Sequence, residues 1–209
     1  MAENKEIAEK KATKAVTMFD DSLLSGGTGL AISIVPCAYT KKYIEWIPRN
    51  KGGGFVNANH DISILSKCTR DEETNRFITV NGNEIVETAQ YFVLVLDPEP
   101  QQAVLALTST QLGVSRKWLT MLRMSKVQNK KGESVDAPMF AYTYRLTTTT
   151  QSNDKGTWHG YSVNQEGPTE LPIAMLAKDF MSAARAGDVQ VKEEQQRDQR
   201  ATPETNNII

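Results

Sequence analysis

Two apolar runs joined by prolines constrain the fold of this chain more than any other feature. Residues 91–96 and 103–107 are rich in β-branched, aromatic and aliphatic side chains, which is typical of strands. Residues 97–100 lie between them and read Asp-Pro-Glu-Pro, and these prolines cannot continue a ladder of backbone hydrogen bonds. The two runs therefore predict an antiparallel hairpin with a rigid connection.

A helix and a second hairpin follow directly. Apolar residues recur at helical spacing over 112–124, after a serine and a threonine that suit a helix N-cap. Strand-like runs at 140–146 and 157–163 come next, with a polar, glycine-containing loop between them. The stretch from 91 to 163 thus predicts two strands, one helix and two more strands.

Further strands are predicted before this stretch. Residues 30–35 and 41–47 each form an apolar run that is ended by a proline. Asn81 and Gly82 separate the strand-like runs 77–80 and 83–86, and this dipeptide favours a two-residue hairpin turn because both residues accept positive φ. We expect a mainly β domain with one crossing helix.

The ends of the chain differ from its middle. Residues 1–27 predict an N-terminal arm with a short helix over 7–18. The β domain occupies 28–165. Residues 166–209 predict a helix that begins near Leu171, with Gly187 past its end, and then a polar, disordered tail.

Composition excludes some classes of protein. The 209 residues are 39% hydrophobic and 23% charged, which suits an ordinary globular protein. No apolar run approaches the roughly 20 residues that a membrane span needs, and the N-terminus lacks the apolar centre of a signal peptide. We therefore expect a cytoplasmic protein, in the host cytoplasm if it is viral, with no membrane partner.

Catalytic and metal-binding patterns are missing from the sequence. His60 and His159 stand outside any motif for nucleophilic catalysis, and Cys37 and Cys68 have no His or Cys at metal-ligand spacing. Asp71 opens an acidic run whose consecutive side chains point in different directions, which is typical of a solvated turn. We expect no enzyme activity, no catalytic residues, no cofactor and no metal.

Charge is unevenly distributed along a chain whose formal net charge is −1. No acidic residue interrupts the segment that contains six basic ones, namely Arg116, Lys117, Arg123, Lys126, Lys130 and Lys131. Such a segment can attract a phosphate backbone through its local field. Solvated basic residues near a helix C-terminus are also common, because they suit the helix dipole. Both interpretations remain open at this point.

The order of elements over residues 28–165 resembles the OB-fold, a small Greek-key barrel that binds oligonucleotides. In particular the chain resembles bacteriophage single-stranded DNA-binding proteins, with the loop at 149–156 matching the long loop between the last two strands. The tail departs from the bacterial pattern, because it ends in Asn-Asn-Ile-Ile and not in an acidic run. The resemblance implies an OB-like antiparallel barrel with flanking N- and C-terminal helices. It also implies single-stranded DNA binding in replication or recombination, other replication or recombination proteins as partners, and homo-oligomers.

Single-strand binding needs aromatic faces for bases and cations for phosphates. The candidates that combine both are Tyr39, Lys41, Tyr43, Arg49, Lys51, Phe55, Tyr144, Arg145, Lys155 and Trp158. We expect the hairpin at 145–158 and the loop at 49–55 to hold the strand between them. The alternative is that many of these aromatic residues fill the core, as Trp118 is expected to do. A second alternative is a virion or regulatory protein that acts through a protein partner.

Overall fold

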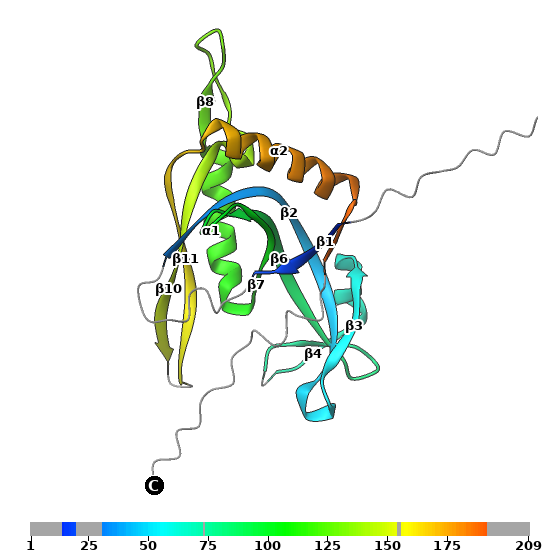
Figure 1. Ribbon diagram of the computed structural model, residues 1–209. Coiled ribbons are helices and arrows are strands. Elements are labelled where there is room, and N and C mark those ends of the chain that lie inside the picture. The colour runs from blue at the N-terminus through cyan, green and yellow to red at the C-terminus, as the bar shows by residue number, and fades with distance from the viewer. Residues whose placement is uncertain (1–13, 20–30, 73, 154–155, 192–209) are drawn as a thin grey trace, which may run out of the picture.

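The computed structural model describes residues 14–19, 31–72, 74–153 and 156–191, and strands make up 51% of the structure, so the prediction of a mainly β fold is confirmed (Figure 1). The strands are β1 (Lys14–Met18), β2 (Ala31–Ile47), β3 (Gly54–His60), β4 (Thr69–Arg70), β5 (Phe77–Ile78), β6 (Glu84–Val95), β7 (Gln101–Thr108), β8 (Lys126–Gln128), β9 (Ser134–Asp136), β10 (Tyr142–Asn153), β11 (Gly156–Pro168) and β12 (Val189–Val191). The α-helices are α1 (Leu112–Met124) and α2 (Leu171–Ala186). Short 3-10 helices are η2 (Arg49–Lys51), η3 (Ile62–Lys67), η4 (Ser109–Gln111) and η5 (Met139–Ala141).

One curled, ten-stranded sheet forms the body of the molecule. Its main path runs β11-β10-β2-β6-β7-β1-β12, and β3, β4 and β5 extend it beside β2 and β6. Pairing is antiparallel except at β1, which runs parallel to both β7 and β12. The sheet is a half-barrel. The finer expectation of an OB barrel stays a prediction.

The central strands are longer than the sequence pattern indicates. The runs at 30–35 and 41–47 were predicted as separate strands, but both belong to β2, so that prediction is wrong. The register shifts between Pro36 and Ala38, and this bulge accommodates a residue that has no N–H to donate. The predicted 83–86 and 91–96 strands likewise merge into β6.

The Asn81–Gly82 turn is real but wider than predicted. Ile78 pairs with Glu84, so the loop spans 79–83 rather than two residues. Within it the Gly82 N–H donates to the Thr79 carbonyl at 2.8 Å, and Gly82 has φ of +76°. A positive φ at this position explains the glycine.

Both chain ends contribute strands that the sequence pattern does not indicate. Residues 14–18 were predicted as the end of a helix and form β1 instead, while residues 1–13 lie outside the described part. Val16 and Met18 are buried, so sheet pairing and burial override local helix propensity. After Gly187 the chain forms β12, where a disordered tail was expected, and residues 192–209 are outside the description.

The three elements predicted after Leu107 are confirmed. Helix α1 covers 112–124, and β10 and β11 form the second hairpin with a shorter loop than expected. Helix α2 begins at Leu171 and ends at Ala186, and Gly187 caps it with φ of +77°, the left-handed conformation common after a helix. No helix in the described ranges has the length and apolar character that crossing a membrane would require.

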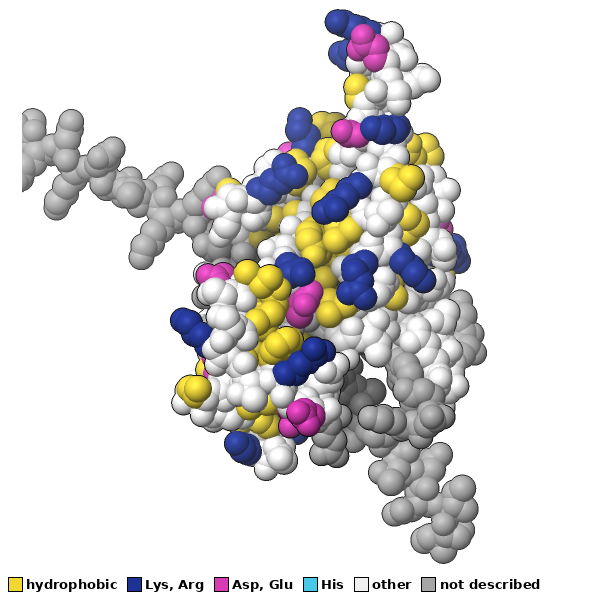
Figure 2. All heavy atoms as spheres, turned by 180° about the vertical axis from the view of Figure 1, so that it is seen from behind, with side chains coloured by type: hydrophobic (Ala, Val, Ile, Leu, Met, Phe, Trp, Pro, Cys, Tyr) yellow, Lys and Arg dark blue, Asp and Glu magenta, His cyan; other side chains and the backbone are white. Residues whose placement is uncertain are grey.

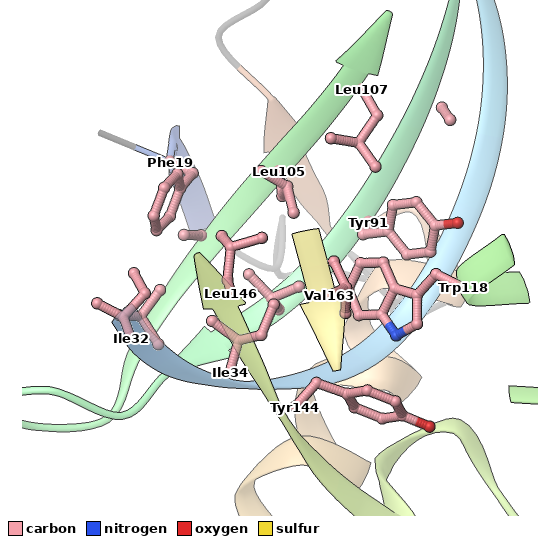
Figure 3. Packing of buried hydrophobic residues seen from close by; sticks show 14 of the residues in the cluster. Phe19, Ile32, Ile34, Tyr91, Leu105, Leu107, Trp118, Tyr144, Leu146 and Val163 are labelled. Carbon is pink, nitrogen blue, oxygen red and sulfur yellow. The ribbon is translucent and has the colours of Figure 1, made fainter. Parts of the chain in front are cut away.

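Each face of the sheet is covered by one helix. On one face α1 packs Trp118 and Leu122 against a cluster that includes Tyr91, Leu105 and Leu146 (Figure 3). On the other face α2 packs Ala177 and Phe180 against a second cluster, which contains Val35, Cys37, Phe92 and Val104. The alternation of side chains along β2 and β6 therefore builds two cores from one sheet.

Candidate functional site

Four aromatic rings lie in series from the core towards the surface, and we call Tyr144, Trp118, Tyr91 and Tyr39 the aromatic stack. Trp118 and Tyr144 meet edge to face at 5.7 Å between ring centroids. Trp118 and Tyr91 are stacked at 4.2 Å, and Tyr91 contacts Tyr39 at 5.0 Å. Figure 3 shows the first three converging from α1, β6 and β10. The stack joins the sheet to α1.

The stack is held rigidly at its buried end. Tyr144, Trp118 and Tyr91 are fully buried. The Tyr91 hydroxyl donates to the Ser115 carbonyl at 3.1 Å and lies 2.8 Å from the Ser115 hydroxyl. Burial raises the pKa of Tyr91, and the hydrogen bond to Ser115 opposes this rise less strongly. A neutral, hydrogen-bonded phenol therefore fixes the position of the next ring outwards.

Tyr39 is the outermost and only partly buried ring of the stack. Burial raises the pKa of Tyr39, whereas the positive charges of Lys41 and Arg123 act against that rise. Lys41 comes from the same face of β2, and Arg123 comes from the last turn of α1. The site thus places a partly exposed aromatic ring within the electrostatic field of two cations.

The two cations differ in how much charge they offer to a ligand. The Lys41 ammonium pairs with Glu87 at 2.8 Å, and this hydrogen bond raises the pKa of Lys41. Arg123 is exposed, and no carboxylate of the described residues pairs with it. Arg123 is therefore the stronger candidate for an anionic partner.

Helix α1 continues this positive charge over its outer surface. Arg116, Lys117 and Arg123 are exposed and, within the described ranges, form no ion pair; we call them the basic face of α1. Figure 2 shows Lys and Arg side chains spread among hydrophobic ones, with some Asp and Glu side chains between them, over one face of the molecule. An anionic chain on this face would meet cations over an extended length.

The structure brings together only part of the predicted site. Tyr39, Lys41 and Tyr43 share one face of β2, but the side chain of Tyr43 is buried, with 4% of its surface exposed. Tyr144 is fully buried inside the stack, so in this structure its ring is not accessible to a base.

The remaining predicted residues lie elsewhere. Arg49 and Lys51 are exposed in η2, where the Lys51 ammonium lies against Gly82, and Phe55 packs edge-on against Trp46 at 5.7 Å. Arg145 points to the opposite face of the sheet from Tyr144 and pairs with Glu166 at 3.1 Å.

The expected pair of strand-holding segments is also separated. Figure 1 shows the β10–β11 tip and the β2–β3 tip on different sides of the molecule. Lys155 and the side chain of Trp158 lie outside the described part, so their predicted contribution stays a prediction.

Sequence reasoning left the basic face of α1 out of the site, although the signal was present. The segment from Arg116 to Lys131 has no acidic residue, and helical spacing puts Arg116 and Arg123 on one side of α1. What the sequence could not indicate is that the end of α1 lies beside Tyr39. Among the described residues no group of three His, Cys, Asp or Glu side chains could hold a metal ion.

Comparison with curated proteins and with solved structures finds no match. A family model described as "Pam3 phage gp34-like protein" matches residues 12–190, which include both α-helices and the whole sheet except the last residue of β12. The match agrees with the expectation of a bacteriophage protein and covers well over half of the chain. The chain belongs to the Pam3 phage gp34-like protein family.

Proposed function

We propose that this phage protein binds single-stranded DNA without strong sequence preference, as a non-enzymatic factor in replication or recombination. The observation that carries the proposal is Tyr39, a partly exposed ring at the end of the aromatic stack, on which the positive charges of Lys41 and Arg123 act. A base that stacks on Tyr39 would extend the series of rings by one member.

Both halves of single-strand recognition are present at this point. Stacking on an aromatic ring tolerates any base, because every base has a π-face. Cations next to the ring can hold the phosphates on either side of the stacked base, and their neutralisation releases counterions from the nucleic acid. The rigid support of Tyr39 lowers the entropic cost of forming the complex, because the ring is already in place.

A titration of a fluorescently labelled oligothymidine at several salt concentrations tests the proposal. We expect binding that weakens steeply as salt rises, because several phosphate contacts are lost together. Absence of binding at low salt would refute single-stranded DNA binding. Double-stranded DNA of equal length serves as a competitor, and it should compete poorly because its bases are not free to stack.

Tyr39→Ala is the decisive variant, and Tyr39→Phe and Arg145→Gln are its controls. Loss of the ring should weaken binding by about tenfold or more, corresponding to about 1–3 kcal/mol for one stacked base, while the salt dependence stays the same. Tyr39→Phe keeps the ring and should bind normally, and Arg145 lies on the other face of the sheet. If Tyr39→Ala stays folded and binds as the wild type does, Tyr39 only closes the core and is no stacking site.

A protein-binding role is the second candidate, and helix α2 favours it. Leu171, Met175 and Leu176 are exposed on α2, at 74%, 62% and 49% respectively. Large apolar side chains grouped on one helix are typical of contact surfaces with other proteins. A protein that binds no oligonucleotide at low salt, but loses a phage partner when Met175 becomes Glu, would support this role instead.

A further inference from the structure

A small two-stranded ribbon stands out from the body of the molecule. It consists of residues 126–136, in which β8 and β9 pair with each other and with no strand of the main sheet. Figures 1 and 2 show it projecting alone beyond the rest of the protein. The outer end of the ribbon therefore adds no strand pairing to the main sheet.

The base of the ribbon is anchored to α1 and β10. The Ala137 N–H donates to the Ser125 carbonyl at 3.0 Å, directly after α1 ends. The Tyr142 hydroxyl donates to the Lys126 carbonyl at 2.7 Å, and the Lys126 ammonium pairs with Asp136 across the two strands. These contacts set the direction in which the ribbon leaves the body.

The turn at the tip of the ribbon is closed by its own hydrogen bonds. The Asn129 side-chain oxygen accepts from the backbone N–H groups of Lys131 and Glu133, at 2.8 and 3.0 Å. The Gly132 N–H donates to the Asn129 carbonyl at 2.9 Å, and Gly132 has φ of +77°. These hydrogen bonds therefore fix the backbone from which the two exposed lysine side chains extend.

The side chains at the tip suit phosphates and not bases. Lys130 and Lys131 are exposed, and among the described residues neither is in an ion pair. Residues 126–136 include no aromatic side chain, so the ribbon has nothing on which a base could stack. Lysine ammonium groups bind phosphate oxygens as point charges and carry no sequence information.

The ribbon is continuous with the basic face of α1. The chain passes from Arg123 through Lys126, which pairs with Asp136, to Lys130 and Lys131 at the tip, where the Glu133 carboxylate accepts a hydrogen bond from Asn129 at 2.8 Å. We propose that the ribbon is an arm that holds the sugar–phosphate backbone of a single strand just beyond the segment stacked at Tyr39. This inference rests on the proposed function and assigns the ribbon a separate part of the strand.

The test compares two double variants of equal charge. Lys130→Gln/Lys131→Gln removes the cations at the tip, and Lys178→Gln/Arg185→Gln removes two exposed cations from α2, on the opposite face of the sheet. Both are titrated with oligothymidines of increasing length at several salt concentrations. Circular dichroism and thermal unfolding of each variant confirm that it remains folded.

We expect the ribbon variant to differ from the wild type only on the longer oligonucleotides. There the slope of log K against log salt should become less steep by about 1.4, because two phosphate contacts are lost and each contributes about 0.7 on a single strand. On the shortest oligonucleotide that the wild type binds, the two proteins should bind equally. The α2 variant should match the wild type at every length.

Three other outcomes would overturn the inference in distinguishable ways. Equal slopes for the ribbon variant and the wild type at all lengths would show that the ribbon does not contact the strand, and would leave the proposed function intact. A reduced slope on the shortest oligonucleotide as well would place the ribbon inside the Tyr39 site and not beyond it. A wild-type protein that binds no oligonucleotide would refute the function and the arm together.

Discussion

Helices α1 and α2 cover opposite faces of the same sheet, yet their outer surfaces differ. Each buries one large aromatic side chain, Trp118 in α1 and Phe180 in α2. The outer surface of α1 is basic, whereas α2 exposes Leu171 and Met175 there. Covering the sheet therefore constrains only the inner positions of a helix, and the outer positions remain open to a different use on each face.

The largest expected effect tests whether the two inner surfaces are equivalent. Trp118→Ala and Phe180→Ala should each lower the free energy of unfolding by about 3–5 kcal/mol, because each leaves a large cavity in its layer. Urea unfolding measures both. An unchanged free energy for one variant would mean that its layer adds little to stability, and the two layers would then not be equivalent.

The same pair of variants also separates stability from binding. Trp118 supports Tyr91, which in turn contacts Tyr39, whereas Phe180 contacts Phe92 on the other face. At a temperature where both variants are folded, only Trp118→Ala should weaken oligonucleotide binding. If the two variants bound the oligonucleotide equally, the aromatic stack would not contribute to binding at Tyr39.

As the pH rises, the buried thiol on the α2 side should lower the free energy of unfolding before the buried tyrosines on the α1 side do. Burial raises the pKa of the Cys37 thiol from 9.0 to about 12, with a weaker opposing effect from a hydrogen bond with the Leu94 backbone. Folding therefore favours the neutral thiol, and this contribution is complete below pH 9 and lost as the pH rises towards 12. Tyr91 and Tyr144 on the α1 side, whose pKa values are also raised by burial, add the same effect only above their ordinary value of 10.0.

Between pH 9 and 10 the free energy of unfolding should thus fall, with one thiol contributing at most about 1.4 kcal/mol per pH unit. Cys37→Ala should remove most of this slope. Cys68→Ala is the matched control, because Cys68 is only partly buried and burial raises its pKa less far. A slope unaffected by Cys37→Ala would show that the thiol reaches solvent in the folded state.

Replacing one glycine in each helix region by alanine should change the free energy of unfolding in opposite directions. Gly187 ends α2 in the left-handed conformation, so Gly187→Ala should destabilise by about 1 kcal/mol through backbone strain. Gly113 lies in the first turn of α1 without a positive φ, and a Cβ there meets nothing within 4 Å. Gly113→Ala should therefore stabilise by about 0.4–1 kcal/mol, and thermal unfolding measures both changes.

Local pattern was sufficient for the elements whose apolar residues repeat at a regular period. Helix α1 and the β6–β7 hairpin appear where the sequence predicts them. The pattern was insufficient where tertiary pairing decides the structure. Lysine and alanine before Val16 favour a helix, and only β7 and β12, distant in the sequence, turn residues 14–18 into a strand. Pro36 suggested a strand end, and a bulge that the sequence does not reveal lets β2 continue.

The candidate site was less predictable than the fold, because accessibility depends on packing. Tyr39 and Tyr43 are both tyrosines on the same face of β2, and only the structure shows that the first is partly exposed and the second buried. The charge of Arg123 acts on Tyr39 because α1 docks on the sheet, and no short-range pattern specifies that docking. The sequence could identify the aromatic and basic side chains that strand binding requires, but not which of them lie close together in the folded protein.

The pairing of β1 with β12 has a consequence for the order of events during synthesis on the ribosome. Lys14 pairs with Val189, so strands from nearly opposite ends of the chain complete the sheet together. Until β12 emerges, β1 can pair only with β7, and its outer backbone groups remain open to solvent. Contacts between such distant segments form late and slowly. Until then the pairing edge of β1 is exposed on the nascent chain, and once β12 has paired with it, β12 becomes the outer strand of this side of the sheet.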